Sequence, residues 1–186
     1  MRKGTSMSKK KLHKFEDKME LTYEQYFRDT YAGIVRFARE LERILGRDKA
    51  LEIIGKTAEK LAVESAKAQV AGTEPVKSLE DFRRLLEGQL ESPFWTHALT
   101  ATFPKEKRQE FTGHVTECIW AKTFKDMDAT DIGYLWICRP DFATAQIYNP
   151  KIKLRRTKTL MQGDSCCNHT YYWEEGKPTP RKVTKR

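Results

Sequence analysis

The sequence lacks any long hydrophobic run. No apolar stretch approaches the roughly 18 residues that a membrane-spanning helix needs, and no apolar segment follows the basic N-terminus as it would in a secretory signal. We therefore expect a cytoplasmic protein with no membrane partner. The glycines are scattered, and the sequence contains no G-x-G-x-x-G, phosphate-binding loop, H-E-x-x-H, G-x-S-x-G or C-x-x-C. These absences exclude the usual signatures of nucleotide-binding enzymes, zinc proteases and serine esterases.

Cysteine is also scarce, with four residues in the chain: Cys118, Cys138, Cys166 and Cys167. They form no evenly spaced disulfide framework. The adjacent pair, Cys166 and Cys167, would point to opposite faces of a strand. This pattern favours free thiols in a reducing compartment.

Positive charge is concentrated at the two ends of the chain. The net charge is +9, and residues 1–14 and 177–186 together hold eleven lysines and arginines and no acid, so removing these eleven charges leaves −2. The sequence therefore predicts a single domain over residues 21–175 between two basic disordered tails, 1–20 and 176–186. Tails of this kind touch phosphates without a specific site, so we expect no specific nucleic-acid partner.

The first half of the chain has helical spacing. Thr22 and Gln25 form a capping-box pattern before a helix that ends at Gly46. A second helix is expected over about 48–70, antiparallel to the first because the link is short. Ser78 caps a third, shorter helix.

The second half changes to a strand-like pattern rich in β-branched and aromatic residues. We expect one β-hairpin over about 94–103 and 109–117, helices over about 118–126 and 130–147, and a break near Pro140. A second hairpin follows, with its turn at Gly163-Asp164. The predicted fold is α+β: a helical hairpin and a short helix packed on an antiparallel sheet of two hairpins, with helices between them.

Cys167 and His169 are the first candidates for chemistry. They lie two residues apart on an expected strand and so share a face. An imidazole can hold a nearby thiol as the nucleophilic thiolate. Asp164 would either orient the imidazole or form an Asx turn after Gly163. The structural alternative is that Cys167 is a small buried hydrophobic residue.

Further candidates lie nearby in the sequence. Cys138 and Asp141 share a helix face if Pro140 permits a turn, and a zinc site formed by Cys118, Cys138, Cys167 and His169 is chemically allowed. However, no ligand pair has the usual short spacing, so we predict no metal and no cofactor. His114 is expected on the same strand face as Cys118. Only one of the adjacent residues Arg155 and Arg156 can point inward, where an arginine would suit a substrate carboxylate. Core packing, helix capping and surface charge are the ordinary roles for all of these residues.

Over residues 118–172 the sequence resembles the L-2-amino-thiazoline-4-carboxylic acid hydrolase family. The pattern is C-x-x-A, then C-x-x-D, then an ending of the type P-x-I-x-x-x-R-T-x-T-L-x-x-G-D-x-x-C. The matching residues are Cys118, Ala121, Cys138, Asp141, Pro150, Ile152, Arg156, Thr157, Thr159, Leu160, Gly163, Asp164, Cys167 and His169. Asn168 stands where the family often has Asp. At the level of fold, the pattern is also similar to vinyl-reductase-type small-molecule-binding domains, which implies a buried ligand cavity and a homodimer.

The resemblance implies hydrolytic opening of a small cyclic compound such as L-2-amino-thiazoline-4-carboxylate. In this interpretation Cys167, His169, Asp164 and Asp141 are the catalytic candidates. The substrate-binding candidates are Arg156, Cys138, Cys118 and His114. The alternative is a non-catalytic small-molecule-binding or sensor domain that uses the same cavity.

Overall fold

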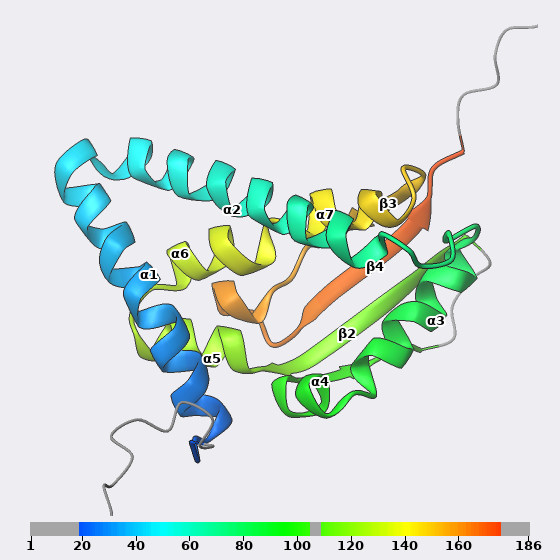
Figure 1. Ribbon diagram of the computed structural model, residues 1–186, viewed down its shortest axis with the longest axis horizontal. Helices are drawn as coiled ribbons and strands as arrows, with labels where there is room; N and C mark the ends of the chain where they lie inside the picture. Colours follow the sequence, from blue (N-terminus) through cyan, green and yellow to red (C-terminus); the bar gives the residue numbers. More distant parts are fainter. Residues whose placement is uncertain (1–18, 105–108, 176–186) are drawn as a thin grey trace, which may run out of the picture.

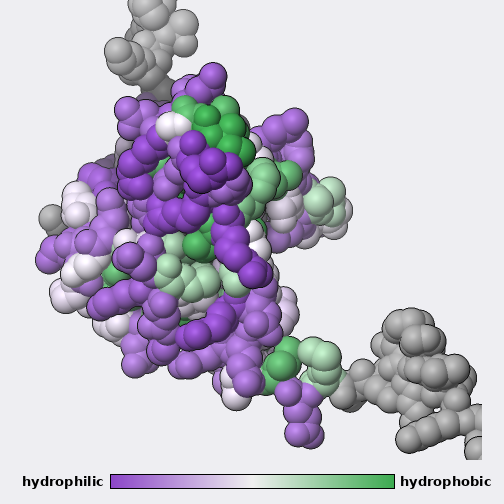
Figure 2. Space-filling model, turned by 90° about the vertical axis from the view of Figure 1, so that its left-hand side faces the viewer, coloured by the Kyte–Doolittle hydropathy of each residue, from purple (hydrophilic) through white to green (hydrophobic). Residues whose placement is uncertain are grey.

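The computed structural model describes residues 19–104 and 109–175. The predicted basic tails lie outside these ranges, apart from Met19 and Glu20. Within the described residues, no helix is both long enough and apolar enough to cross a membrane. On the face that Figure 2 shows, hydrophilic residues predominate and hydrophobic residues form smaller patches.

The predicted helical hairpin is confirmed. It consists of α1 (Tyr23–Leu45) and α2 (Arg47–Val70), whose arms diverge from the link at Gly46 (Figure 1). The capping box is present, because the Thr22 hydroxyl accepts a hydrogen bond from the Gln25 amide at 3.2 Å and the Gln25 side chain accepts one from the Thr22 amide at 3.0 Å. Gly46 has a φ of +80°, a conformation that L side chains disfavour, and so it ends α1.

The third predicted helix is also present, but the residues after it differ from the expectation. Ser78 caps α3 (Leu79–Leu90) by accepting a hydrogen bond from the Asp81 amide at 3.0 Å. The expected strand over 94–103 is wrong for most of its length, because Pro93–Ala98 form the helix α4 and only Leu99–Thr102 form the strand β1. Pro93 occupies the first turn of α4, where a missing N–H costs nothing and the fixed φ favours the helix. The aromatic residues that suggested a strand therefore lie on a short helix.

The sheet has four antiparallel strands in the order β1-β2-β4-β3. Its other strands are β2 (Glu110–Cys118), β3 (Ile152–Arg155) and β4 (Cys167–Trp173). The two hairpins meet where β2 pairs with β4, with Val115 opposite Cys167 and Gly113 opposite His169. The α+β fold class is confirmed.

The second hairpin does not turn at Gly163-Asp164 as predicted. β3 ends at Arg155 and β4 begins at Cys167, and a loop that contains the 3₁₀ turn η2 (Leu160–Gln162) joins them. Gly163, at a φ of +96°, ends this turn. The loop bonds to its own backbone instead of extending the ladder, since the Asp164 amide donates to the Thr159 carbonyl at 3.2 Å.

The helical stretch after β2 is divided into pieces. It comprises α5 (Ile119–Asp126), α6 (Thr130–Gly133), the π-helical turn η1 (Tyr134–Cys138) and α7 (Asp141–Tyr148). In η1 the Arg139 amide donates to the Tyr134 carbonyl, five residues earlier, at 2.8 Å. The break expected near Pro140 is present, because proline has no N–H with which to continue the helical ladder. π-helical turns of this kind occur often at functional sites.

Candidate active site

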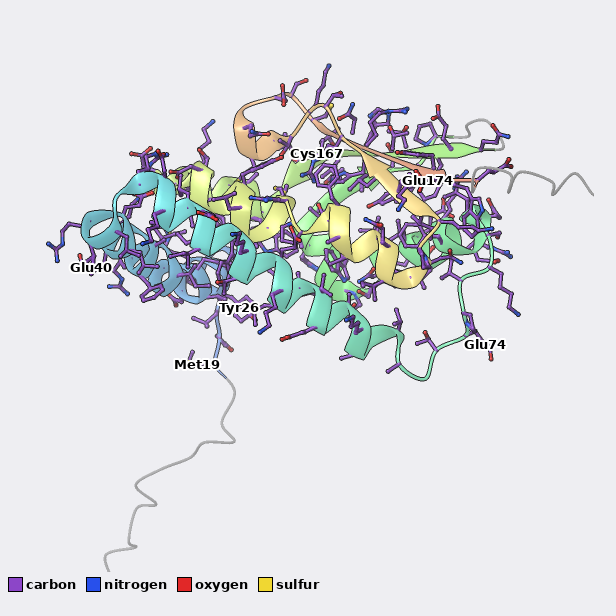
Figure 3. The ribbon with its side chains drawn as sticks, turned by 90° about the horizontal axis from the view of Figure 1, so that it is seen from above. Met19, Tyr26, Glu40, Glu74, Cys167 and Glu174 are labelled. Atoms are coloured by element: carbon purple, nitrogen blue, oxygen red, sulfur yellow. The ribbon has the colours of Figure 1, made fainter. Side chains whose placement is uncertain are left out.

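A cavity of about 560 Å³ lies between one face of the sheet and the helices that cover it. Its lining residues come mainly from α2, α3, β2, β4, η1 and α7. Figure 3 shows these layers from above, with Cys167 on β4 near the middle of the long axis. The size is typical of a site for a small organic molecule.

Six of the eight candidate residues line this one cavity: Cys118, Cys138, Asp141, Arg156, Cys167 and His169. Each is placed by the end of an element. Cys118 ends β2, Cys138 ends η1, and Asp141 begins α7. Arg156 follows β3, and Cys167 and His169 lie near the start of β4. The predicted shared faces of Cys167 with His169, and of Cys138 with Asp141, are therefore observed.

His114 does not line this cavity, and its predicted common face with Cys118 is wrong. The pairing of β1 with β2 slips between Thr100 and Ala101, so that Thr116 is an extra residue in β2. A bulge of this kind reverses the alternation of the side chains beyond it. Gly113, Val115 and Cys118 consequently face the cavity. His114 lies opposite Asn168 in the sheet.

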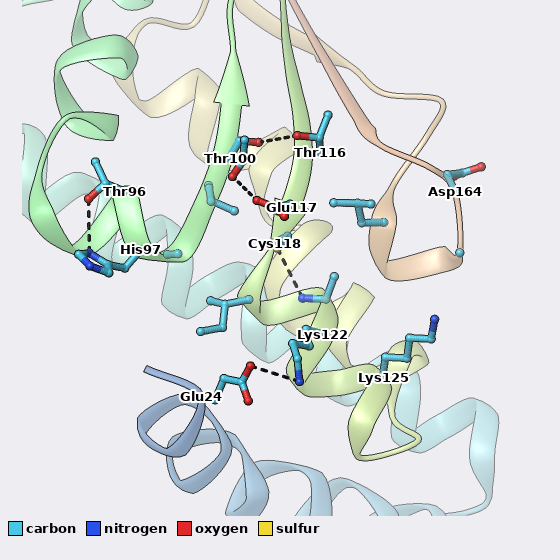
Figure 4. Close-up of a pocket in the computed structure, with 16 residues that line it drawn as sticks. Glu24, Thr96, His97, Thr100, Thr116, Glu117, Cys118, Lys122, Lys125 and Asp164 are labelled. Carbon is cyan, nitrogen blue, oxygen red and sulfur yellow. Dashed lines mark hydrogen bonds and ion pairs between the residues drawn. The ribbon is translucent and has the colours of Figure 1, made fainter. Parts of the chain in front are cut away.

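Asp164 also lies apart from the cavity residues. Its carboxylate accepts a hydrogen bond from the Thr159 amide at 2.7 Å, which closes the loop before β4. Asp164 borders a second, surface hollow that contains Lys122 and Lys125 and shares Leu99 and Cys118 with the cavity (Figure 4). The contact with the Thr159 amide is not the expected Asx turn, because the amide lies five residues before Asp164, and the imidazole of His169 contacts Asp141 and Arg156 instead.

Asn168, which stands where the resembling pattern often has Asp, forms hydrogen bonds with the same loop. Its Oδ1 accepts hydrogen bonds from the Thr157 amide at 3.0 Å and from the Lys158 amide at 2.7 Å. Its Nδ2 donates to the Thr157 hydroxyl at 2.8 Å. A carboxylate could accept the same two amide bonds. The departure from Asp therefore changes a loop contact and removes no group from the cavity wall.

Arg156 is the centre of the polar cluster in the cavity. Its Nη1 donates to Asp141 Oδ2 at 2.7 Å and lies 3.0 Å from His169 Nε2, and its Nη2 donates to the Cys138 carbonyl at 2.8 Å. The side chain is 3% exposed, against 17% for His169 and 39% for Asp141. Of the two adjacent arginines, Arg156 is thus the inward one, while Arg155 is 58% exposed and bonds to Glu110.

An arginine can only donate, so the 3.0 Å contact between Arg156 Nη1 and His169 Nε2 is a hydrogen bond in the tautomer whose Nε2 accepts. The same Nε2 lies 3.5 Å from Asp141 Oδ2. Burial by itself would lower the pKa of the Arg156 guanidinium, but Asp141, Cys138 and Tyr134 together outweigh this effect, and the pKa is raised. The cluster thus combines a buried cation, a carboxylate and an imidazole.

The cavity thiols differ in their surroundings. Burial raises the pKa of Cys118 to about 11 and that of Cys138 to about 12. Both thiols therefore stay protonated near neutral pH and are poor nucleophiles. Cys167 is 6% exposed, and its sulfur accepts a hydrogen bond from the Leu160 amide at 3.3 Å.

Two further contributions to the site come from residues outside the eight candidates. Aromatic rings flank Arg156: its guanidinium carbon lies 5.0 Å from the centre of the Phe142 ring and 5.8 Å from that of Tyr134. The small residues Ala62 and Ala66 of α2 leave room for the cavity. Ala62 and Ala66 recur at helical spacing in the sequence, but this spacing indicates a core face as readily as a cavity wall. Within residues 19–104 and 109–175, no three His, Cys, Asp or Glu side chains gather closely enough to hold a metal ion.

Comparison with known proteins gives a family but no individual curated relative. A search of curated proteins found no match. The model of the family described as L-2-amino-thiazoline-4-carboxylic acid hydrolase matches residues 23–171, which include all the cavity residues named above. The chain therefore belongs to the L-2-amino-thiazoline-4-carboxylic acid hydrolase family.

Proposed function

We propose that the cavity opens the ring of a cyclic isothiourea, with Cys167 as the nucleophile and Asp141 as the group that receives the ring nitrogens. Family membership implies hydrolysis of substrates like L-2-amino-thiazoline-4-carboxylate. The observation that carries the residue roles is the convergence of Cys167, Asp141, Arg156 and His169 on one cavity. The predicted homodimer stays a prediction.

Asp141 suits the isothiourea group. When protonated, this group presents two parallel N–H donors, which match the two oxygens of a carboxylate. Asp141 lies in the cavity wall and is 39% exposed, and Arg156 and His169 hold it from behind. The contact also keeps the ring protonated, which makes its C2 carbon, between nitrogen and sulfur, more electrophilic. Arg156 acts here as a positioning residue.

Cys167 is the thiol best placed to attack C2. A bond forms between its sulfur and C2, the thiol proton passes to the Asp141 carboxylate, and the C2–N π electrons pass to the ring nitrogen. Collapse of this adduct breaks one ring bond, and Asp141 returns the proton to the leaving atom. Water then adds to C2 and releases the Cys167 thiol, so that one water is consumed overall. Cys118 and Cys138 are less suited to the attack because burial raises the pKa of both thiols.

The test compares Cys167→Ala with Cys166→Ala, a neighbouring thiol that does not line the cavity. Ring opening of L-2-amino-thiazoline-4-carboxylate is followed by mass spectrometry. We expect kcat/KM to fall at least about 1,000-fold in Cys167→Ala and to stay within about twofold in Cys166→Ala. Undiminished turnover in Cys167→Ala would rule out the nucleophile.

A wild-type protein that does not open the ring, but whose melting temperature rises with the compound, would instead establish the non-catalytic binding alternative. A ligand that binds only the native state raises its stability. Asp141→Asn tests the carboxylate in both roles, because an amide cannot match both N–H donors. We expect the variant to raise KM as well as lower kcat.

A further inference from the structure

The cavity is larger and more apolar than a small carboxylated ring requires. We infer that its preferred substrate is a cyclic isothiourea that carries a large apolar substituent, aryl or branched alkyl, in place of a second charged group. This inference names the substrate class and rests on the proposed ring-opening function. Three features of the described cavity wall support it: volume, composition and the distribution of charge.

The first feature is volume. At the share of about 30 Å³ that a water occupies in the liquid, the nine non-hydrogen atoms of L-2-amino-thiazoline-4-carboxylate fill at most about 270 Å³. The cavity measures about 560 Å³. About half of it would stay empty or hold water if the small ring were the whole substrate. Binding sites bury most of a ligand's surface, so an unfilled half indicates a larger ligand.

The second feature is the composition of the wall away from the Asp141 cluster. From α3 and α4, Phe82, Leu86, Gln89, Leu90 and Trp95 line the cavity; four of these five are apolar, and none carries a charge. Phe82 is 2% exposed and its ring contacts those of Tyr148 and Tyr171 at centroid distances of 5.3 and 5.1 Å. An apolar substituent bound here would move from water to a hydrophobic surface, which favours binding.

The third feature is the absence of a spare cation. Among the described residues that line the cavity, Arg156 is the only lysine or arginine. Its three hydrogen bonds to Asp141, His169 and the Cys138 carbonyl already engage it, and it is 3% exposed. A substrate carboxylate would enter an apolar region without a free counter-ion, which is costly. This is why Arg156, proposed from the sequence to hold a carboxylate, fits better as a support for Asp141.

The first measurement uses three probes: unsubstituted 2-amino-thiazoline, its 4-carboxylate and its 4-benzyl derivative. Wild-type kcat/KM is measured for each, and binding to Cys167→Ala is measured by calorimetry. We expect the benzyl compound to exceed both others by about 10- to 100-fold in kcat/KM and in affinity, the range that a well-filled apolar pocket provides. A benzyl compound that is no better than the unsubstituted ring overturns the inference.

The second measurement fills the cavity. Ala62→Leu adds volume at a half-buried cavity residue, while Ala68→Leu makes the same change at an exposed residue of α2 that does not line the cavity. Ala62→Leu should lower the affinity for the benzyl compound at least about 10-fold, and by a larger factor than the affinity for the unsubstituted ring. Ala68→Leu should change neither.

The outcomes separate the two proposals. Efficient turnover of the carboxylate with poor turnover of the benzyl compound overturns the substrate class and leaves the ring-opening function intact. Tight binding of the benzyl compound without ring opening of any probe overturns the function and supports the ligand class. Equal losses of benzyl affinity in Ala62→Leu and Ala68→Leu overturn the assignment of the substituent to this cavity.

Discussion

Replacing Arg156 by methionine should destabilise the protein far more than the same change at its neighbour Arg155. Both are arginines, one residue apart, at the end of the same strand. Arg156 is 3% exposed and holds Asp141, His169 and the Cys138 carbonyl, whereas Arg155 is 58% exposed and its ion pair with Glu110 spans 3.2 Å. The pair of variants thus tests the inward direction that separates these two residues.

The magnitude follows from the partners that each variant leaves behind. Breaking a buried ion pair costs about 3–5 kcal/mol, since the remaining charge loses its compensation. We expect about 3 kcal/mol for Arg156→Met, the lower end, because Asp141 is 39% exposed and water can solvate part of it. Arg155→Met removes an exposed pair worth about 0.5 kcal/mol. For a domain of this size, about 3 kcal/mol lowers the melting temperature by roughly 6–12 °C.

The assay is urea unfolding at pH 7, followed by tryptophan fluorescence, for the wild type and both variants. Arg156→Lys adds a check: it keeps the charge but cannot reach all three partners, so its loss of stability should lie between those of the other two variants. Equal unfolding free energies for Arg155→Met and Arg156→Met would refute the inward placement of Arg156, and with it the polar cluster.

Three further changes test other parts of the fold. Gly133→Ala places a Cβ 2.6 Å from Phe124 and should cost about 1–3 kcal/mol of stability. Gly33→Ala has open space around the new Cβ and should not destabilise the protein. The melting temperatures of both variants test this difference. Partial burial would raise the pKa of Asp131, but hydrogen bonds from two arginines lower it to about 2. Above its unfolded pKa of 3.8, the carboxylate therefore stabilises the fold by about 1 kcal/mol, and this contribution is lost as the pH falls toward 2. In urea melts, the difference in unfolding free energy between the wild type and Asp131→Asn should therefore disappear over that pH range. Native iodoacetamide labelling of Cys118, read by mass spectrometry, should be about 100-fold slower than that of a free thiol because burial raises its pKa from 9.0 to about 11; labelling at the free-thiol rate would contradict its burial.

The helical half of the fold was predictable because its signals are local. The capping box at Thr22, the stop at Gly46 and the cap at Ser78 involve residues within one helical turn, and each has the expected contacts or position. The break at Pro140 is local too. The segment at Pro93–Ala98 was mispredicted, because aromatic content indicates burial and is shared by strands and buried helices.

The sequence predicted most of the residues that line the site, but not how they are arranged in space. Alternation along one strand placed Cys167 and His169 on a common face, and helical spacing did the same for Cys138 and Asp141. The same rule failed for Cys118 and His114, because the bulge at Thr116 depends on how β2 pairs with β1. Asp164 resembled a catalytic acid by its nearness in sequence to Cys167, yet its carboxylate closes a loop.

The sequence by itself determined the α+β class, the caps of the first helices, the free thiols and the family pattern, because these depend on neighbouring residues or on residue order. Only the tertiary structure decided which of the candidates share a cavity, since they lie on separate elements that meet only when β2 pairs with β4. It also decided what Arg156 does. Sequence showed that one of two arginines faces inward, but the contacts with Asp141 and His169 arise from residues 15 and 13 positions away. Such contacts follow from packing, which no local pattern encodes.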